Sequence, residues 1–130
     1  MKGYIVDLEK ATLANGNFRQ VLYTAKHSQL VLMALVPGDD IGEEIHELDQ
    51  FIRVEAGQGK AVLNGVEHEL KDGSAVVVPA GVKHNIINTS SEPLKLYTLY
   101  SPPEHKDGTV QAGKKEALAA HEHFDGVTSE

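Results

Sequence analysis

The chain has 130 residues, of which 41% are hydrophobic and 24% charged, and its formal net charge is −7 at neutral pH. This length and composition predict one globular domain over residues 1–130. The negative charge argues against broad electrostatic binding to nucleic acid or to an anionic membrane. The chain has no cysteine, which excludes disulfides, thiolate metal sites and cysteine nucleophiles, so any metal must be bound by oxygen and nitrogen atoms.

The N-terminal stretch MKGYIVDLEK lacks the apolar segment of a signal peptide. No apolar run approaches membrane-spanning length. We therefore expect a cytoplasmic protein. The following residues, 8–15, fit either a short helical turn or irregular structure.

From about residue 18 to about residue 101, short extended runs alternate with turn signals. The runs cover residues 18–26, 29–37, 51–57, 60–70, 74–79, 84–90 and 94–101. Asn64-Gly65 divides the fourth run into a hairpin, because both residues tolerate positive φ. Eight or more short strands at this spacing predict an all-β antiparallel sandwich or barrel.

The C-terminal tail has a different composition. Residues 114–124 are rich in Ala, Glu, Lys and Leu, which predicts a short helix within a tail of about 112–124. The last residues, 125–130, are expected to fray.

One polar stretch interrupts the strand pattern. In GEEIHELDQF, the side chains of Glu44, His46 and Gln50 fall at even spacing, which places them on one face of an extended chain. Taken alone, a glutamate and a histidine on a strand face are more often simply exposed to solvent.

A second stretch, GSAVVVPAGVKHNIIN, favours the interpretation that the polar residues of the first stretch are metal ligands. Pro79 stops a buried apolar strand, Gly81 permits a positive-φ turn, and His84 starts the next strand. Neutral imidazole is the commonest protein metal ligand, so a histidine placed in this way is a candidate ligand.

The two stretches together resemble the paired motifs of the cupin superfamily, whose members are small jelly-roll β-barrels. The first motif fits with every spacing kept, and the second matches without a departure. The matching positions of the first are Gly38, Glu44, His46, Gln50 and Gly57, and those of the second are Gly73, Pro79, Gly81, His84 and Asn88. The segment YSPPEHKDGT further resembles small bacterial and archaeal single-cupin proteins, often labelled sugar-phosphate-isomerase-like (mannose-6-phosphate-isomerase-like).

The resemblance implies that Glu44, His46, Gln50 and His84 converge on a divalent metal inside the barrel. Glu44 stands where the family usually has histidine, and Gln50 where it usually has glutamate. The formal ligand charge stays at −1, and Gln50 offers a neutral, weaker carbonyl donor. In this family the chain bends between its second and third ligands, so we expect a turn at Glu47-Leu48-Asp49.

Two histidines and one carboxylate are also the composition of non-haem Fe(II) sites. Fe, Mn, Zn, Ni, Co and Cu all fit the donor set. The resulting hypothesis is a metal-dependent isomerase, lyase or dioxygenase acting on a small polar metabolite, such as a sugar derivative or an enolisable carbonyl compound. The alternative is a non-catalytic small-molecule binding or sensing barrel with structural metal or none. The resemblance also implies a homodimer.

Other histidine patterns are interpreted as non-catalytic. HELDQ lacks the second histidine of the HExxH zinc-protease motif and leads into a strand. His121 and His123 flank Glu122 but point in different directions if the tail is helical. We expect them to be surface residues, together with three other histidines: His27, His68 and His105.

Two further side chains have alternative interpretations. Tyr97 is either an ordinary packing residue or an inward-facing proton donor near the metal. Strand alternation puts Arg53 on the face opposite Gln50, where it is expected to lie outside the barrel, at a dimer contact. The chain has no GxSxG, P-loop or dinucleotide fingerprint, so nucleophile-elbow, NTP and NAD chemistry have no support.

Overall fold

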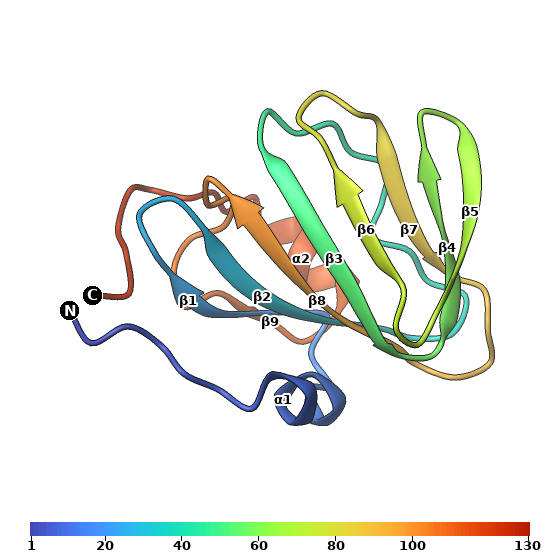
Figure 1. Ribbon diagram of the computed structural model, residues 1–130, viewed down its shortest axis with the longest axis horizontal. Coiled ribbons are helices and arrows are strands. Elements are labelled where there is room, and N and C mark those ends of the chain that lie inside the picture. The colour runs from blue at the N-terminus through green and yellow to red at the C-terminus, as the bar shows by residue number, and fades with distance from the viewer.

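The computed structural model describes residues 1–130 as two antiparallel sheets that face each other (Figure 1). The larger sheet has the strand order β6-β3-β8-β2-β1-β9, and the smaller one has the order β5-β4-β7. This arrangement is the predicted antiparallel jelly-roll β-barrel, and the chain is all-β apart from two short helices. The strands are β1 (Arg19–Thr24), β2 (Gln29–Leu35), β3 (Asp49–Ala56), β4 (Gln58–Leu63), β5 (Val66–Lys71), β6 (Ala75–Val78), β7 (His84–Asn88), β8 (Leu94–Ser101) and β9 (Val110–Gln111).

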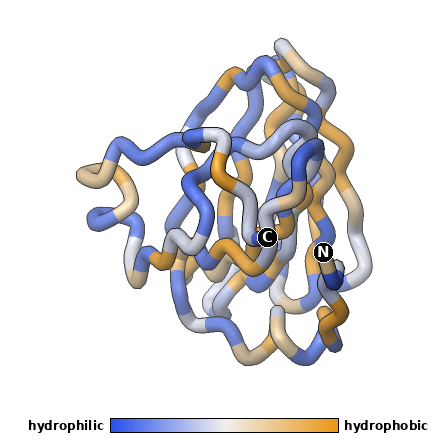
Figure 2. Tube along the Cα trace, turned by 90° about the vertical axis from the view of Figure 1, so that its left-hand side faces the viewer, coloured by the Kyte–Doolittle hydropathy of each residue, from blue (hydrophilic) through white to orange (hydrophobic).

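The hydrophobic core lies between the sheets and follows from strand alternation. Along β8, inward residues are buried at every second position, and their neighbours in β2 and β3 pair with them in register. Ile52, for example, lies opposite Thr98, and both are fully buried. Hydrophobic residues recur along the strands in Figure 2, with hydrophilic residues in the connecting loops.

Two turns explain why glycine is needed at particular positions. Asn64 and Gly65 both have positive φ and join β4 to β5, which confirms the predicted hairpin. Gly57 has φ of +93°, and a Cβ there would lie 2.5 Å from the carbonyl oxygen of Pro93. No other residue fits this position without displacing the backbone.

The first helix, α1 (Leu8–Ala14), resolves the two interpretations of residues 8–15 in favour of helix. The Asp7 side chain caps it by accepting a hydrogen bond from the amide of Lys10 at 3.3 Å. In Figure 1 this helix lies below the larger sheet, and Lys95 of β8 donates to the carbonyl of Leu13 at its end at 2.8 Å.

The second helix, α2 (Lys114–Ala120), is shorter than predicted. His121 takes a left-handed conformation with φ of 49° and ends it. The carboxylate of Glu122 then bonds to the amide of Lys106 at 2.9 Å and to His105 at 2.7 Å. These bonds draw the chain away from a helical path, so residues 121–124 are not helical.

The two termini lie side by side at one end of the molecule (Figure 1). The Glu130 carboxylate accepts hydrogen bonds from the amides of Lys2 and Gly3 and from the Tyr23 hydroxyl. The final residues therefore make specific contacts, where fraying was expected. Neither helix has the length and apolarity that crossing a membrane requires.

Candidate metal centre

Glu44 is positioned by backbone pairing with the second motif. The segment before β3 runs beside β7, and the amides of Glu44 and His84 each donate to the carbonyl of the other at 2.9 Å. Residues paired in this way carry their side chains on the same side of the sheet. The carboxylate of Glu44 and the imidazole of His84 therefore face the barrel interior together.

His46 follows two residues later and is tied to the second motif as well. The amide of Gly81 donates to the carbonyl of His46 at 2.8 Å, and Gly81 has φ of +87°, which L-residues rarely adopt. The predicted turn lies at Glu47 and Leu48, after which Asp49 begins β3. The hydrogen bond between Gly81 and His46 thus fixes the turn of the second motif against the segment that carries Glu44 and His46.

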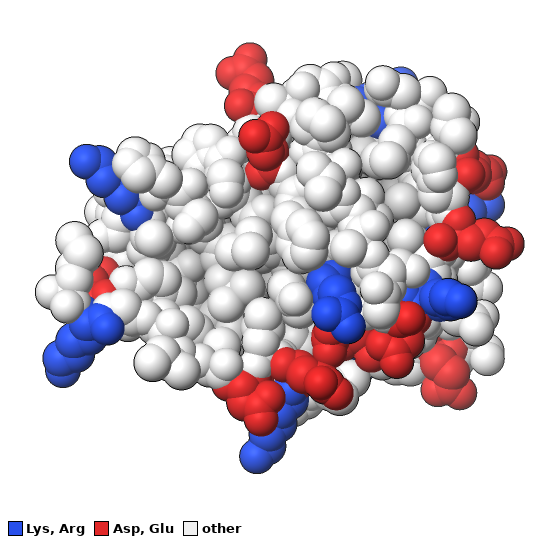
Figure 3. Space-filling model, viewed as in Figure 1, with Lys and Arg blue, Asp and Glu red and all other residues white.

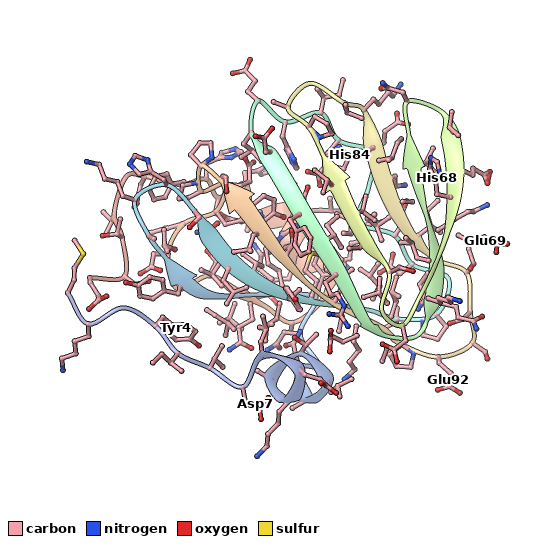
Figure 4. The ribbon with its side chains drawn as sticks, in the orientation of Figure 1. Tyr4, Asp7, His68, Glu69, His84 and Glu92 are labelled. Atoms are coloured by element: carbon pink, nitrogen blue, oxygen red, sulfur yellow. The ribbon has the colours of Figure 1, made fainter.

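His84 is buried at the start of β7, and its side chain is oriented by the turn before it. Its Nδ1 donates to the carbonyl of Val82 at 2.8 Å. In the neutral ring this leaves the Nε2 lone pair available to a metal, which is the usual orientation of a ligating histidine. Figure 4 shows His84 in the space between the sheets, whereas His68 lies on β5 at the outer edge.

Gln50 lies on β3, is only 4% exposed and lines the same cavity. Its Nε2 donates to the hydroxyl of Thr98 at 3.0 Å, so its Oε1 is identified as the free end of the amide. That oxygen is buried and has no hydrogen-bond partner. Buried acceptors without a partner are rare in folded proteins, and a bound cation would satisfy this one.

The structure brings the three ionisable candidates together. Ligand atoms of Glu44, His46 and His84 all lie within 4.8 Å of one another. The cavity that they line with Gln50 has a free volume of about 10 Å³, which is room for one water-sized occupant. The donor set of oxygen and nitrogen atoms, with the unpaired Gln50 oxygen beside it, fits a divalent transition metal.

The charges of Glu44 and His46 are strongly coupled because His46 Nε2 lies against the Glu44 carboxylate. Burial alone raises the pKa of Glu44, but the hydrogen bond and charge of His46 outweigh it, so the pKa is lowered. Burial alone would lower the pKa of His46, but the hydrogen bond and the charge of Glu44 outweigh it, so the pKa is raised. The site therefore keeps an ionised carboxylate in a partly buried place.

The sequence profile of the family described as "Cupin domain" matches residues 31–100, which is more than half of the chain. YrkC of Bacillus subtilis is 46% identical over 128 residues, covering 93% of this chain and 69% of that protein.

The chain belongs to the cupin superfamily.

Solved cupin structures agree with this assignment. The crystal structure of BH2720 from Bacillus halodurans superposes with a TM-score of 0.90 at 43% identity, covering 92% of this chain and 96% of that one. A predicted oxalate decarboxylase from Thermotoga maritima has a TM-score of 0.57 at 24% identity, covering 59% and 68%. The second likeness is one of fold alone.

The cupin motif residues that are not candidate ligands have structural roles. The side chain of Asn88 is fully buried; it donates to the carbonyls of Leu35 and Glu92 at 3.0 and 2.8 Å, and it accepts from the amide of Ser90 at 2.9 Å. Gly57 provides the close backbone approach described above. These two motif positions shape the loop before β8 and do not line the cavity.

Tyr100 lines the cavity of this cupin, although the sequence interpretation singled out Tyr97 instead. Tyr97 faces outward and packs on Phe51, with ring centroids 6.4 Å apart. The ring of Tyr100 meets that of His46 edge-on at 6.0 Å. Burial raises the pKa of the Tyr100 phenol, so it is protonated at neutral pH. Strand alternation could have found this residue, since Tyr100 shares the face of the buried Leu96 and Thr98.

The prediction that His105 is a surface residue is wrong. It is buried between Tyr100 and Glu122, and its Nδ1 bonds to the Glu122 carboxylate at 2.7 Å. A lone histidine in a loop gives no pattern from which burial can be predicted. His121 and His123 are exposed, as are His27 and His68, as expected.

Arg53 lies on the outward face of β3, as alternation predicts, with its guanidinium 3.3 Å from the carboxylate of Glu55. It is half-buried and belongs to the larger sheet's outer surface. It does not reach the cavity, so it takes no part in the candidate metal centre.

Proposed function

We propose that this cupin binds one divalent transition metal through Glu44, His46, His84 and the Gln50 carbonyl oxygen. We further propose that it is a metal-dependent enzyme acting on a small polar metabolite, such as a sugar derivative or an enolisable carbonyl compound. The observation that carries the proposal is the convergence of three ionisable ligand atoms within 4.8 Å, in a buried cavity.

The donor geometry supports a metal better than a purely hydrogen-bonded interior. His84 keeps a ring nitrogen free, and Gln50 keeps a buried carbonyl oxygen without a donor. A polar interior that satisfied itself would pair such atoms. Two imidazoles, one carboxylate and one amide oxygen leave coordination positions open for a ligand.

A bound metal of this kind supplies Lewis-acid chemistry, or oxygen activation if it is redox-active. The side chains around it have separate tasks. Glu44 keeps its charge in the partly buried site and, when not coordinating, is placed to act as a general base. Tyr100 presents a neutral hydroxyl to the cavity, and Ile52 and Ile86 exclude water from it.

Elemental analysis of untagged protein tests the metal site directly. We expect close to one divalent metal per chain, lost in the double variant His46→Ala/His84→Ala. The variant His27→Ala/His68→Ala removes two exposed histidines and serves as the matched control. Metal-free protein that neither takes up added metal nor gains stability from it would refute the proposal.

The reaction class requires a second experiment on metal-loaded protein. Oxygen consumption with enolisable diketones or catechols would identify a dioxygenase. Proton NMR of sugar phosphates in deuterated buffer would identify an isomerase, because enolisation exchanges the carbon-bound hydrogen. Turnover by wild-type protein that disappears in His84→Ala is the expected result.

A non-catalytic binding or sensing barrel is the alternative, and the small cavity favours it. Space of about 10 Å³ holds a metal or a water molecule but no metabolite beside it. Catalysis therefore requires the cavity to widen when substrate binds. A metal-loaded protein that binds small carboxylates without consuming oxygen or exchanging hydrogen would support the alternative.

We also propose that the protein is a homodimer that pairs through the outer face of its larger sheet. Figure 3 shows that the upper and central part of the side drawn in Figure 1 is largely uncharged, with a group of charged residues to the lower right of the centre. Val77 and Leu99 are exposed on this sheet by 64% and 36%. Exposed apolar surface of this kind commonly marks an interface.

A further inference from the structure

A chain of polar side chains leads from the cavity to the C-terminal tail. Tyr100 lines the cavity, and its hydroxyl lies 3.4 Å from Nε2 of His105. Nδ1 of the same imidazole bonds to the Glu122 carboxylate at 2.7 Å. His105 and Glu122 both lie beyond residue 100, where the family profile ends. They belong to the tail that follows the last long strand, β8.

The direction of these hydrogen bonds follows from chemistry. An ionised carboxylate only accepts, so in neutral His105 the hydrogen resides on Nδ1 and points at Glu122. Nε2 then carries a lone pair, which faces the hydroxyl of Tyr100. The hydroxyl hydrogen of Tyr100 therefore points at His105. The lone pairs of its oxygen are left to accept a hydrogen bond from a group in the cavity.

Both positioning groups are firmly anchored. Gln29 is fully buried, and its oxygen accepts from the amide of His105 at 3.0 Å while its Nε2 donates to the His105 carbonyl at 2.7 Å. The second oxygen of Glu122 accepts from the amide of Lys106 at 2.9 Å. Gln29 therefore fixes the backbone of His105, and turning the imidazole would break its bond to the Glu122 carboxylate.

We propose that Tyr100 is a ligand-contacting residue that acts as a hydrogen-bond acceptor, and that His105 and Glu122 are positioning residues that set this polarity. The proposal rests on the proposed metal site, and it narrows the class of ligand. The group beside Tyr100 carries a hydrogen, as a hydroxyl or a bound water does. A ligand with fluorine or an ether oxygen at that place is disfavoured.

One isosteric substitution reverses the polarity. In Glu122→Gln the side-chain oxygen must face the Lys106 amide, because that backbone group only donates. The new amide nitrogen then faces Nδ1 of His105, which becomes an acceptor. The imidazole hydrogen moves to Nε2 and points at Tyr100, whose own hydrogen is released toward the cavity.

Nitrogen-15 NMR of the histidine side chains measures which ring nitrogen of His105 carries the hydrogen. The measurement is made on metal-free protein at about pH 8, where histidine is ordinarily neutral. Wild-type His105 is expected as the Nδ1–H tautomer, and Glu122→Gln as the Nε2–H tautomer. Glu104→Gln is the matched control, as it removes a neighbouring carboxylate that does not contact the ring. A wild-type His105 that carries its hydrogen on Nε2 would overturn the proposal.

Ligand preference is measured on cobalt-loaded protein with glycolate and fluoroacetate, followed by cobalt absorption. The two probes match in shape, but only glycolate carries a hydroxyl hydrogen. Tyr100→Phe is expected to reduce the preference for glycolate about 3- to 10-fold, as for loss of one hydrogen bond. Glu122→Gln should reduce it in the same direction, whereas the outward-facing control Tyr97→Phe should leave it unchanged.

An equal preference in wild type and Tyr100→Phe refutes the role of Tyr100, provided that both proteins bind cobalt and melt at similar temperatures. Failure of all the proteins to bind cobalt would instead refute the proposed metal site. The tautomer of His105 is measured without metal, so it still decides the polarity of the array in that case.

Discussion

Glu44 and His84 are joined by two backbone hydrogen bonds of 2.9 Å, in which each amide donates to the carbonyl of the other residue. These two candidate ligands come from motifs 40 residues apart in the chain, and yet their positions are set by main-chain pairing. We therefore expect the site to be formed before any metal binds, because the ligands are ordered by the fold itself.

Gln50→Glu tests the exchange of ligand types at this site. A carboxylate at position 50 raises the formal ligand charge from −1 to −2, so divalent metal should bind at least about 10-fold more tightly. The metal-free variant should be less stable than wild type, because the new carboxylate is buried close to Glu44. Competition with a chromogenic chelator measures the affinity.

Gln50→Leu gives the opposite substitution, with the amide removed and the volume kept. We expect weaker metal binding and only a small change in the stability of the metal-free protein, because removal of the unpaired Oε1 offsets the loss of the Nε2 bond to Thr98. Equal metal affinity in the Glu and Leu variants would show that position 50 is not a ligand.

Gly57→Ala tests the close approach between β3 and the loop before β8. The new Cβ would lie 2.5 Å from the Pro93 carbonyl oxygen, at a φ of +93°. Gly73→Ala has a similar φ of +89° with open space around it, so it carries only the backbone cost of about 1–2 kcal/mol. We expect the free energy of unfolding to fall by roughly 1–3 kcal/mol more for Gly57→Ala, as overpacking does. Urea unfolding of both variants measures the difference.

The hydrogen-bonded carboxylate of Glu122 gives a prediction about pH. Burial alone would raise the pKa of Glu122, but the hydrogen bonds from His105 and the Lys106 amide outweigh it and lower the pKa below 4.5. Its contribution to stability is therefore present above pH 4.5 and is lost as pH falls through the lower folded-state pKa.

Glu122→Gln should accordingly be less stable than wild type by roughly 1–3 kcal/mol at neutral pH, with the difference shrinking below pH 4.5. Thermal melts from pH 3 to pH 7 measure it. A difference that stayed constant over this range would mean that the charge of Glu122 contributes nothing.

The homodimer proposal is tested by light scattering after size-exclusion chromatography. Wild-type protein should have about twice the chain mass of 14.1 kDa. Val77→Lys, on the outer face of the larger sheet, should shift it toward monomer. Val66→Lys changes a valine on the smaller sheet that is exposed by 57%, compared with 64% for Val77, and should leave the mass unchanged.

Much of the barrel could be predicted from local sequence signals. The Asn64-Gly65 hairpin, the breaks at Pro79 and Gly81, and the apolar runs each determine structure through their own neighbours. Predicted strands of the larger sheet consequently agree with β1, β2, β3 and β8 to within a few residues. The family resemblance added which residues of separate strands meet at the cavity.

The tail could not be predicted in the same way. Its composition favours a helix through residue 124, but the helix ends at Ala120, because Glu122 forms stronger contacts with His105 and Lys106. These partners lie about 16 residues away in the chain. Local propensity carries no information about such pairing, which is why His105 was expected at the surface.

The position of the tail separates two tasks along the chain. The barrel supplies every candidate metal ligand, whereas the residues that orient the Tyr100 hydroxyl lie beyond residue 100, where the family profile ends. In the proposed site, a substitution at His105 or Glu122 would therefore change the choice of ligand and leave the candidate metal ligands in place, so that metal affinity and ligand selectivity can be altered on separate parts of one chain.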